Sequence, residues 1–464
     1  MRQPNIILIN CDDMGYGDLS CYGSAVNHTP AIDRLAREGV RCTSWYSPSP
    51  VCSPSRGATL TGCYPPRIGF GSFTGCPVLF PGHSVGLHPD EPTFADYLRS
   101  AGYRTCLIGK WHCGDQPPFL PASHGFDEFY GLPYSNDMGR QKGHPPVSAI
   151  GNPYPPLPLM ENDTIVQLQP DQKNLTERYT ERAVGFIREN SGRPFLLYFN
   201  HYHVHLPHYA PDYLTAQSDN GVFGACMASV DWSVAVLRRT LEDLGLLDNT
   251  LIIFTSDNGS RGDHGASNGP LRGAKTTTWE GGQRVPCIWY WQGHTPEGAV
   301  CDEIMSHNDF FATFLSLAGT EPADDLPRDS SDVSGVILRG ETRPESENVF
   351  YYYWMNTLEA VRVGKWKLHL AKHPGPRESY EVREIYDLDA DIGETRNLYD
   401  ERPDIFEFFF RYVADILIDL GDEYHHIPGE RVRSSGEVSD PCLLTTYDET
   451  YPYLIAEYDS AESG

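Results

Sequence analysis

The sequence contains neither a long hydrophobic segment nor an excess of positive charge. Its apolar runs, such as residues 6–9 and 196–199, are far shorter than the roughly 20 residues that a membrane-spanning helix needs. The chain has 464 residues, of which 63 are Asp or Glu and 36 are Lys or Arg, so its formal net charge is −27. A surface this acidic repels phosphate backbones and anionic lipid headgroups. We therefore expect no nucleic-acid partner and no membrane partner.

Paired Cys-x-x-Cys motifs and a secretory signal are also lacking. The 12 cysteines are irregularly spaced, which argues against a structural zinc site and favours reduced, buried thiols. The opening residues, Met1-Arg2-Gln3-Pro4, show none of the features of a signal peptide. We expect a cytoplasmic protein; the alternative is a periplasmic or secreted protein whose signal peptide is absent from this sequence.

Apolar and aromatic residues, by contrast, are plentiful. Hydrophobic residues make up 40% of the chain and aromatic residues 12%, which excludes a disordered protein. At roughly 100–200 residues per domain, this length predicts two or three domains, or one large α/β unit with a smaller companion.

Short apolar runs alternate with helical patterns through the first two thirds of the chain. This alternation predicts an α/β fold with a large, mostly parallel central sheet flanked by helices. In such sheets, ligands lie beyond the carboxyl ends of the strands. The predicted strands span residues 5–10, 104–108, 194–200 and 250–255, and the predicted helices span residues 93–101, 176–190 and 227–244.

Two breaks interrupt this pattern. Residues 139–163 are rich in Pro and Gly and predict a long surface loop, whereas residues 319–334 are acidic and rich in Ser. The remaining chain predicts strands without long intervening helices (348–355, 360–370 and 384–388), followed by a helix over 403–420. We therefore expect a catalytic α/β domain over residues 1–340 and a smaller C-terminal α+β subdomain with an antiparallel sheet over residues 341–464.

Acidic side chains follow two of the predicted strands directly. Asp12 and Asp13 come after the first strand, and Asp257 and Asn258 come after the strand over 250–255. Grouped at one sheet edge, these carboxylates would repel each other unless a cation joined them, and hard oxygen ligands suit calcium or magnesium. Either pair alone is also typical of a turn or a helix cap. Because such pairs follow two buried strands, a metal site is the favoured interpretation.

The segment over residues 52–62, Cys-Ser-Pro-Ser-Arg-Gly-Ala-Thr-Leu-Thr-Gly, predicts a helix that begins near Pro54 and ends at Gly62. Cys52 would then lie at the helix N-terminus, where free N–H groups favour anions. Arg56 would share its face and could bind the same anion. The alternative is a buried structural cysteine beside a solvated arginine.

This segment resembles the signature of the type I sulfatases, in the arylsulfatase A-like branch of the alkaline-phosphatase-like superfamily. The resemblance covers nearly the whole chain. It includes Asp12-Asp13-x-Gly-x-Gly-Asp, Asp257-Asn258-Gly, Gly109-Lys110-Trp111-His112, His203-x-His205-x-Pro207, and Lys275 through Glu280-Gly281-Gly282. It implies an alkaline-phosphatase-like fold and a maturation enzyme that converts Cys52 to formylglycine, whose hydrated aldehyde is the nucleophile.

The resemblance also implies a role for each matched residue. Asp12, Asp13, Asp257 and Asn258, together with the modified Cys52, would hold calcium, with magnesium as the alternative. Arg56 would stabilise the nucleophile, and Lys110 and Lys275 would bind sulfate oxygens. His205 would protonate the leaving alcohol, and His112 would accept the proton whose removal expels sulfate. Ser135 and His203 would contact the substrate.

We therefore predict a sulfatase that hydrolyses a sulfate monoester, either of a carbohydrate or of an aryl alcohol. Two alternatives remain open. The first is a phosphonate monoester or phosphodiester hydrolase of the same superfamily, since such relatives share the Cys-x-Pro-x-Arg motif and the metal site. The second is a non-catalytic, calcium-stabilised binding protein in which Cys52 is never modified.

Overall fold

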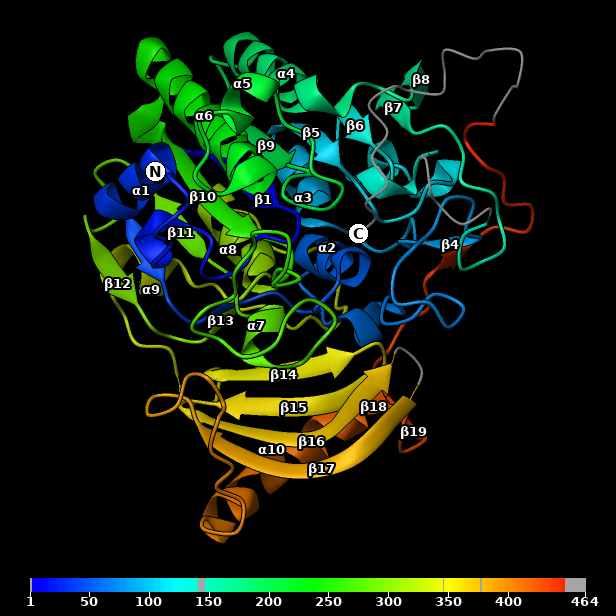
Figure 1. The fold of residues 1–464 in the computed structure, drawn as a ribbon, viewed down its shortest axis with the longest axis vertical. Coiled ribbons are helices and arrows are strands. Elements are labelled where there is room, and N and C mark those ends of the chain that lie inside the picture. Colours follow the sequence, from blue (N-terminus) through cyan, green and yellow to red (C-terminus); the bar gives the residue numbers. More distant parts are fainter. Residues whose placement is uncertain (1, 141–146, 345, 376–377, 447–464) are drawn as a thin grey trace.

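The computed structural model describes residues 2–140, 147–344, 346–375 and 378–446. A twisted sheet of ten strands runs through the larger part of the molecule (Figure 1). Its strand order is β12-β2-β11-β10-β1-β9-β5-β6-β7-β8. The five central strands are parallel, and they are β10 (Thr250–Ser256), β1 (Asn5–Cys11), β9 (Phe195–Asn200), β5 (Arg104–Lys110) and β6 (Glu128–Leu132).

Antiparallel strands extend the sheet on both sides. On one side β11 pairs antiparallel with β10 and with β2, and β12 pairs parallel with β2. On the other side β7 and β8 continue from β6 as antiparallel neighbours. These outer strands are β11 (Cys287–Tyr290), β2 (Val40–Cys42), β12 (Ala299–Cys301), β7 (Pro158–Glu161) and β8 (Thr164–Leu168).

Helices cover both faces of the sheet. Successive side chains of β1 point to opposite faces, and both sets are apolar. Ile7 and Ile9 belong to the core under one group of helices, whereas Ile6 and Leu8 belong to the core under the other. A strand buried on both faces reads as a continuous apolar run, as residues 6–9 do. The first face carries α1 (Pro30–Glu38), α4 (Leu175–Glu189) and α6 (Gly221–Leu244); the second carries α2 (Cys52–Thr61), α3 (Phe94–Ser100) and α8 (Asp309–Ala318).

Of the helices in the described part of the chain, α6 is long and apolar enough to cross a membrane by length and composition. However, 67% of its apolar window is buried inside the molecule, where it packs on α1 and α4. Core helices of globular proteins pass the same test, because they too are apolar around most of their circumference.

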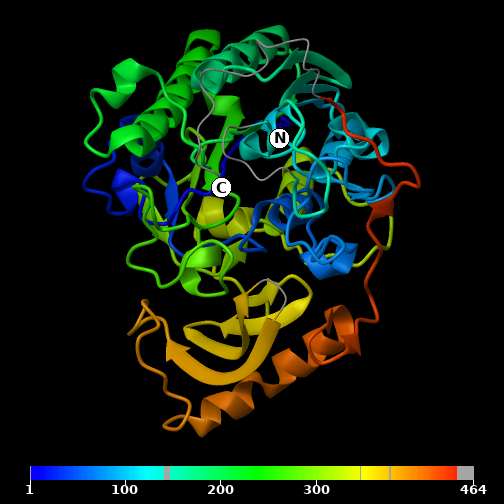
Figure 2. The same cartoon turned by 45° about the vertical axis from the view of Figure 1, so that its right-hand side comes forward.

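A separate antiparallel sheet of four strands lies below the large one (Figure 1). It consists of β14 (Val349–Trp354), β15 (Thr357–Val363), β16 (Trp366–Gly375) and β17 (Glu378–Asp387). Helix α10 (Pro403–Leu420) covers the face of this sheet that is turned away from the larger part (Figure 2). The following chain returns to the larger part, where β20 (Gly436–Glu437) pairs with β4 (Val85–Gly86).

The predicted fold class is confirmed, with four local differences. The strand predicted over 384–388 is the end of β17, which begins six residues earlier, at Glu378. Residues 139–163 include the short strand β7, so they are not all loop. The run over 360–370 spans two strands, because the chain reverses at Gly364, whose φ is +53°. Helix α6 begins at Gly221, six residues before the predicted start, because Gly221 and Gly224 interrupt the apolar period in its first turn. The proposed boundary near residue 340 stays a prediction.

Short elements complete the fold. They are α5 (Asp212–Thr215), α7 (Glu280–Gln283), α9 (Ser334–Arg339), β3 (Trp45–Tyr46), β13 (Met305–Ser306), β18 (Gly421–Asp422) and β19 (Ile427–Pro428).

Candidate active site

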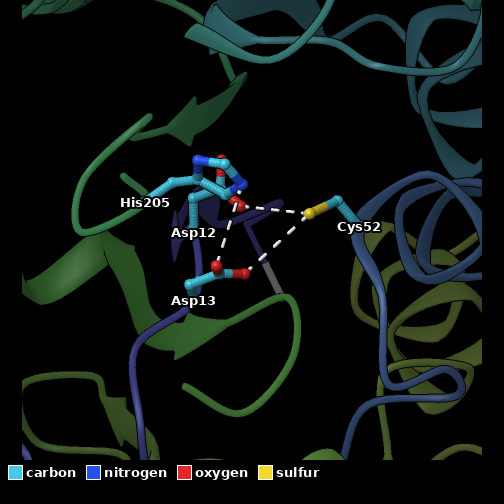
Figure 3. A group of neighbouring side chains, drawn as sticks. All are labelled: Asp12, Asp13, Cys52 and His205. Atoms are coloured by element: carbon cyan, nitrogen blue, oxygen red, sulfur yellow. Dashed lines mark hydrogen bonds and ion pairs between the residues drawn. The ribbon is translucent and has the colours of Figure 1, made fainter. Parts of the chain in front are cut away.

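The carboxyl ends of four neighbouring central strands meet at one edge of the sheet, and the predicted site residues follow them directly. Asp12 and Asp13 follow β1, Asp257 and Asn258 follow β10, Lys110 ends β5, and His205 lies in the loop after β9. Figure 3 shows Asp12, Asp13 and His205 converging on Cys52, which approaches from the opposite side. The parallel order of the strands therefore brings together residues from four distant stretches of sequence.

Cys52 is the first residue of α2, as the sequence predicts. The helix ends at Gly62, whose φ of +69° is left-handed and suits glycine at that position. The thiol is buried, and its Sγ lies 3.3 Å from Asp12 Oδ1 and 4.0 Å from Asp13 Oδ1. Burial first, and then the negative charge of Asp12, raise the pKa of the Cys52 thiol well above its usual value. An unmodified Cys52 is therefore a neutral thiol and a weak nucleophile.

Each of the three site carboxylates is paired with a cation. Lys110 Nζ lies 2.5 Å from Asp12 Oδ2, and Lys275 Nζ lies 2.8 Å from Asp13 Oδ2.

The third pair joins Arg56 and Asp257. Arg56 Nε and Nη2 lie 2.9 and 2.7 Å from Asp257 Oδ2. Its Nη1 donates to the backbone oxygen of Lys110 at 2.9 Å, so Arg56 links α2 to the ends of β10 and β5. Because the guanidinium is buried, these bonds fix α2, and with it Cys52, against the sheet edge.

The oxygen atoms that remain suit a divalent cation. The Oδ1 atoms of Asp12 and Asp13 face Cys52, while their Oδ2 atoms bind the two lysines. Potential ligand atoms of Asp12, Asp13, Cys52 and His205 all lie within 4.8 Å of one another. The amide oxygen of Asn258 is buried and has no hydrogen-bond partner among the described residues. Hard oxygen donors and an unpartnered amide oxygen fit calcium or magnesium.

The pKa shifts of the carboxylates reflect the same crowding. Burial raises the pKa of Asp12 and Asp13, but the lysines beside them outweigh burial, so both pKa values lie below the usual range. Burial and the charge of Asp12 raise the pKa of Asp257 to about 7. A bound cation would relieve the repulsion between these carboxylates.

His112 is held in one tautomer. Its Nε2 lies 3.0 Å from the backbone oxygen of Leu79, and since a carbonyl oxygen can only accept, Nε2 carries the hydrogen. Its Nδ1 is buried and has no partner among the described residues. Burial and the charge of Lys110 lower the pKa of His112 well below its usual value. His112 is therefore a neutral imidazole whose basic nitrogen is free to accept a proton.

His205 is oriented in the opposite sense. Its Nδ1 contacts the backbone oxygen of Leu206 and so carries the hydrogen, while Nε2 lies 3.8 Å from Asp13 Oδ2. Burial and then the charge of Lys275 lower the pKa of His205. The exchangeable position of this ring is Nε2, on the side of the carboxylates.

The remaining predicted residues lie at different depths. Ser135 Oγ accepts a hydrogen bond from Lys110 Nζ at 3.1 Å, and Ser135 lines the cavity above Cys52. His203 is fully buried against Tyr202, and neither of its ring nitrogens has a partner among the described residues. It does not belong to the described cavity lining. His201 lies 3.0 Å from Ser233 of α6 and so belongs to the core.

A cavity of 580 Å³ opens above Cys52. Its wall combines aromatic and apolar side chains with a few charged ones. The members that sequence motifs missed are Val51, Pro77, Val78, Phe80, Asp137, Met138, Tyr154, Arg261 and Asp263. They come from loops between elements, where no periodic pattern marks a side chain as facing a pocket. In the sequence, the one indication that these residues could line the cavity is that several of them lie close to a matched segment.

Comparison with known proteins agrees with this geometry. A model of the Sulfatase family matches residues 4–320. The chain is 39% identical over 387 residues to N-acetylgalactosamine-6-sulfatase from Sus scrofa, covering 79% of this chain and 72% of that protein. It is 37% identical over 429 residues to arylsulfatase A from Bos taurus, covering 86% and 83%. The solved structure of Ps i-CgsB in complex with k-i-k-neocarrahexaose matches with a TM-score of 0.77 at 29% identity, covering 89% and 92%.

Proposed function

This chain belongs to the sulfatase family and is a sulfuric ester hydrolase, and on that premise we propose that a formylglycine made from Cys52 and a divalent cation, calcium by preference, carry the reaction. The observation that supports this most directly is the position of Cys52. Cys52 lines the cavity, and its Sγ lies 3.3 Å from Asp12 Oδ1.

The cation would be held by Asp12, Asp13, Asp257 and Asn258. When bound, such a cation would act as a Lewis acid and would make the hydroxyl of a hydrated formylglycine at residue 52 a nucleophile near neutral pH. The other oxygens of these carboxylates, Asp12 Oδ2 and Asp13 Oδ2, pair with Lys110 and Lys275, so both ammonium groups lie beside the cation site, where they would bind the sulfate. Negative charge that develops on the sulfate oxygens is then stabilised by Lys110 and Lys275.

The two histidines divide the proton transfers between them. His112 lines the same cavity as Cys52, and its Nδ1, which has no partner among the described residues, would accept a proton from residue 52 as sulfate is released. His205 Nε2 donates a proton to the leaving alcohol, and the negative charge of the bound sulfate ester favours its protonated form. Arg56 holds the N-terminal turn of α2 next to Asp257 and the end of β5.

The substrate we propose is a sulfated carbohydrate, with an aryl sulfate as the alternative. The cavity wall pairs aromatic side chains, Phe80 and Tyr154, with polar ones, Asp137 and Asp263. A sugar ring has one apolar face and a rim of hydroxyl groups, which suits such a wall. The names of two of the similar proteins refer to carbohydrates: N-acetylgalactosamine-6-sulfatase and the complex with k-i-k-neocarrahexaose.

Two measurements test the proposal. Mass spectrometry of the peptide containing residue 52, from protein co-expressed with a formylglycine-generating enzyme, should show a loss of about 18 Da, because a thiol is replaced by an aldehyde. A panel of monosaccharides sulfated at different positions, with nitrophenyl sulfate and a phosphonate monoester as controls, should then show preferred turnover of one sulfated sugar. Unmodified Cys52 in fully active protein would contradict the formylglycine mechanism. Faster turnover of the phosphonate than of any sulfate ester would favour the phosphonate hydrolase instead.

We also propose that the protein is located in the cytoplasm. All 12 cysteines are free thiols, and most are buried, as expected for a protein of the cytoplasm. Fractionation of the native host, followed by detection of the protein in each fraction, checks it.

A further inference from the structure

Residues 272–280 form an arm that lies between the catalytic cavity and the four-stranded sheet. On the cavity side, Lys275 pairs with Asp13 and Thr276 lines the wall. On the other side, the arm continues into α7, which sits directly above β14 in Figure 1. Every shift of this arm therefore moves Lys275 relative to the site.

The cavity side of the arm is fixed by its backbone. The backbone N–H of Lys275 donates to the oxygen of Ser260 at 2.8 Å, and that of Thr276 donates to the oxygen of Pro50 at 2.9 Å. These bonds join the arm to the segment after Asp257 and to the segment before Cys52.

Thr276 itself has a φ of +72°, a left-handed conformation that a β-branched residue avoids. Such a conformation persists only where the surroundings hold it, and it is frequent at functional sites.

Two side chains of the four-stranded sheet hold this part of the arm. His373 Nε2 lies 2.7 Å from the backbone oxygen of Thr276, and its Nδ1 lies 2.8 Å from Glu359 Oε1. Since a carbonyl oxygen can only accept, Nε2 donates. Glu359 Oε2 accepts a hydrogen bond from Thr278 Oγ1 at 2.6 Å, so His373 and Glu359 together bind the arm on both sides of residue 277. The ring of His373 is stacked on Trp354, with centroids 4.2 Å apart.

A second set of buried contacts holds the far end of the arm. Lys367 Nζ donates to the backbone oxygen of Thr278 at 2.9 Å and to Glu280 Oε1 at 3.0 Å. The backbone N–H of Glu280 donates to Glu394 Oε2 at 2.9 Å. The end of the arm is thus anchored by buried polar contacts, whereas the part next to Lys275 is held by its backbone bonds to Ser260 and Pro50 and, from the four-stranded sheet, by His373 and Glu359.

We propose that Glu359 and His373 are positioning residues that hold the arm in the conformation from which Lys275 reaches the sulfate. The four-stranded sheet would thereby affect catalysis indirectly, through the arm that carries Lys275. This inference rests on the proposed sulfate-binding role of Lys275. It predicts that the effect of His373 on catalysis passes through Lys275.

A double-mutant cycle tests that prediction. His373→Phe keeps a ring on Trp354 but removes both hydrogen bonds, and it is combined with Lys275→Ala. Two quantities are measured for the four proteins: kcat/KM with nitrophenyl sulfate, and the Kd of inorganic sulfate by titration calorimetry. We expect His373→Phe to lower kcat/KM by about 10- to 100-fold, the effect of a small misplacement of a binding group. In the Lys275→Ala background the same change should lower kcat/KM, or raise the Kd of sulfate, by no more than about 2-fold.

Matched variants separate positioning from folding. His373→Gln, which can still donate from Nε2 to Thr276, should restore most of the rate and affinity. Lys365→Ala breaks an ion pair of 2.7 Å with Asp387 on the same sheet, away from the arm, and should change neither quantity. If His373→Phe does not fold, Thr278→Val replaces it in the cycle, since it removes the bond to Glu359 without changing the side-chain volume.

The outcomes are distinct. Losses that multiply in the double variant, with Lys275→Ala itself impaired, would overturn the inference and leave the proposed function intact. Wild-type rates and sulfate affinity in Lys275→Ala would overturn the role of Lys275, and the inference with it. A His373→Phe variant with the wild-type kcat/KM and sulfate affinity would overturn the inference and leave the role of Lys275 intact.

Discussion

Three cations and three carboxylates form a paired cluster beside Cys52, and this pairing explains how a sulfate ester enters a molecule whose net charge is −27. Lys110, Lys275 and Arg56 each neutralise one of the buried carboxylates. A divalent cation added to this neutral cluster makes the site positive. An anionic substrate is therefore attracted locally, although the surface as a whole repels it.

The first prediction concerns Cys52. Replacing it with Ala should abolish turnover, because no other side chain occupies the nucleophile position, while the fold should remain nearly unchanged. We expect less than about a thousandth of the wild-type kcat, a loss typical of removing a nucleophile. Nitrophenyl sulfate turnover and thermal unfolding measure the two effects. A variant that retains more activity than this would show that residue 52 is not the nucleophile.

A second prediction separates the acid from a sulfate-binding cation. A sugar alkoxide leaves poorly without a proton, whereas nitrophenolate leaves readily. His205→Ala should therefore slow hydrolysis of a sulfated sugar far more than that of nitrophenyl sulfate. The two losses should differ by up to roughly 100- to 10,000-fold, the factor that general acid catalysis typically contributes. Lys110→Ala should slow both substrates alike, because it contacts the sulfate that they share. This prediction is tested by measuring kcat/KM for both variants on both substrates. If His205→Ala lowers kcat/KM equally for the two substrates, this histidine binds sulfate and is not the acid.

At this scale, the residues that sequence motifs indicate and those that they miss differ in a physical way. Asp12, Asp257 and Lys110 follow strands whose burial is visible as apolar runs, so their place at the sheet edge could be predicted. Phe80 and Arg261 reach the same cavity from loops whose course depends on tertiary contacts. Those contacts leave no periodic trace in the sequence.

Among the elements, α10 spans the predicted residues 403–420, and α2 also agrees closely, because Pro54 lies in its first turn, Gly62 caps its end and both follow local rules. Agreement was poorer where an apolar pattern continued through a turn, as in residues 360–370, or where a strand was only four residues long, as in β7. The order of the strands in the large sheet depends on pairings between distant segments, and the sequence carries no local signal for it.

The third prediction tests the packing of α2. Gly57 has no room for a side chain, since a Cβ there would lie 2.5 Å from Cδ1 of the buried Phe70. Ala is favoured over Gly in a helix by roughly 0.5–1 kcal/mol, but overpacking typically costs about 1–3 kcal/mol. Gly57→Ala should therefore lower the free energy of unfolding and displace Cys52 and Arg56, which lowers kcat.

Gly185 in α4 offers a matched control, because a Cβ there meets nothing within 4 Å. Gly185→Ala should leave kcat unchanged and raise the melting temperature. Denaturant unfolding and nitrophenyl sulfate turnover of the two variants measure the contrast. An equal gain in stability for both would show that α2 does not pack tightly on Phe70.

For the whole molecule, the site joins segments that are otherwise far apart in the sequence, and a bound cation would join them further. Asp12 and Asp13 end one strand and Asp257 and Asn258 end its neighbour. An ion that binds the folded protein stabilises it by about 2.7 kcal/mol when its concentration is 100 times its Kd. The final prediction is therefore that exhaustive chelation lowers both the activity and the melting temperature of the wild-type protein.

Calcium should restore both properties more fully than magnesium, because calcium tolerates an irregular set of oxygen ligands that magnesium does not. Asp257→Ala provides the control. It should be inactive and less stable from the outset, in part because it leaves Arg56 buried without its carboxylate, and a chelator should shift its melting temperature no further. Activity is measured together with thermal unfolding at each added ion concentration. Full activity after chelation and dialysis would exclude a catalytic metal, and the three carboxylates would then serve only to hold Arg56, Lys110 and Lys275 in place.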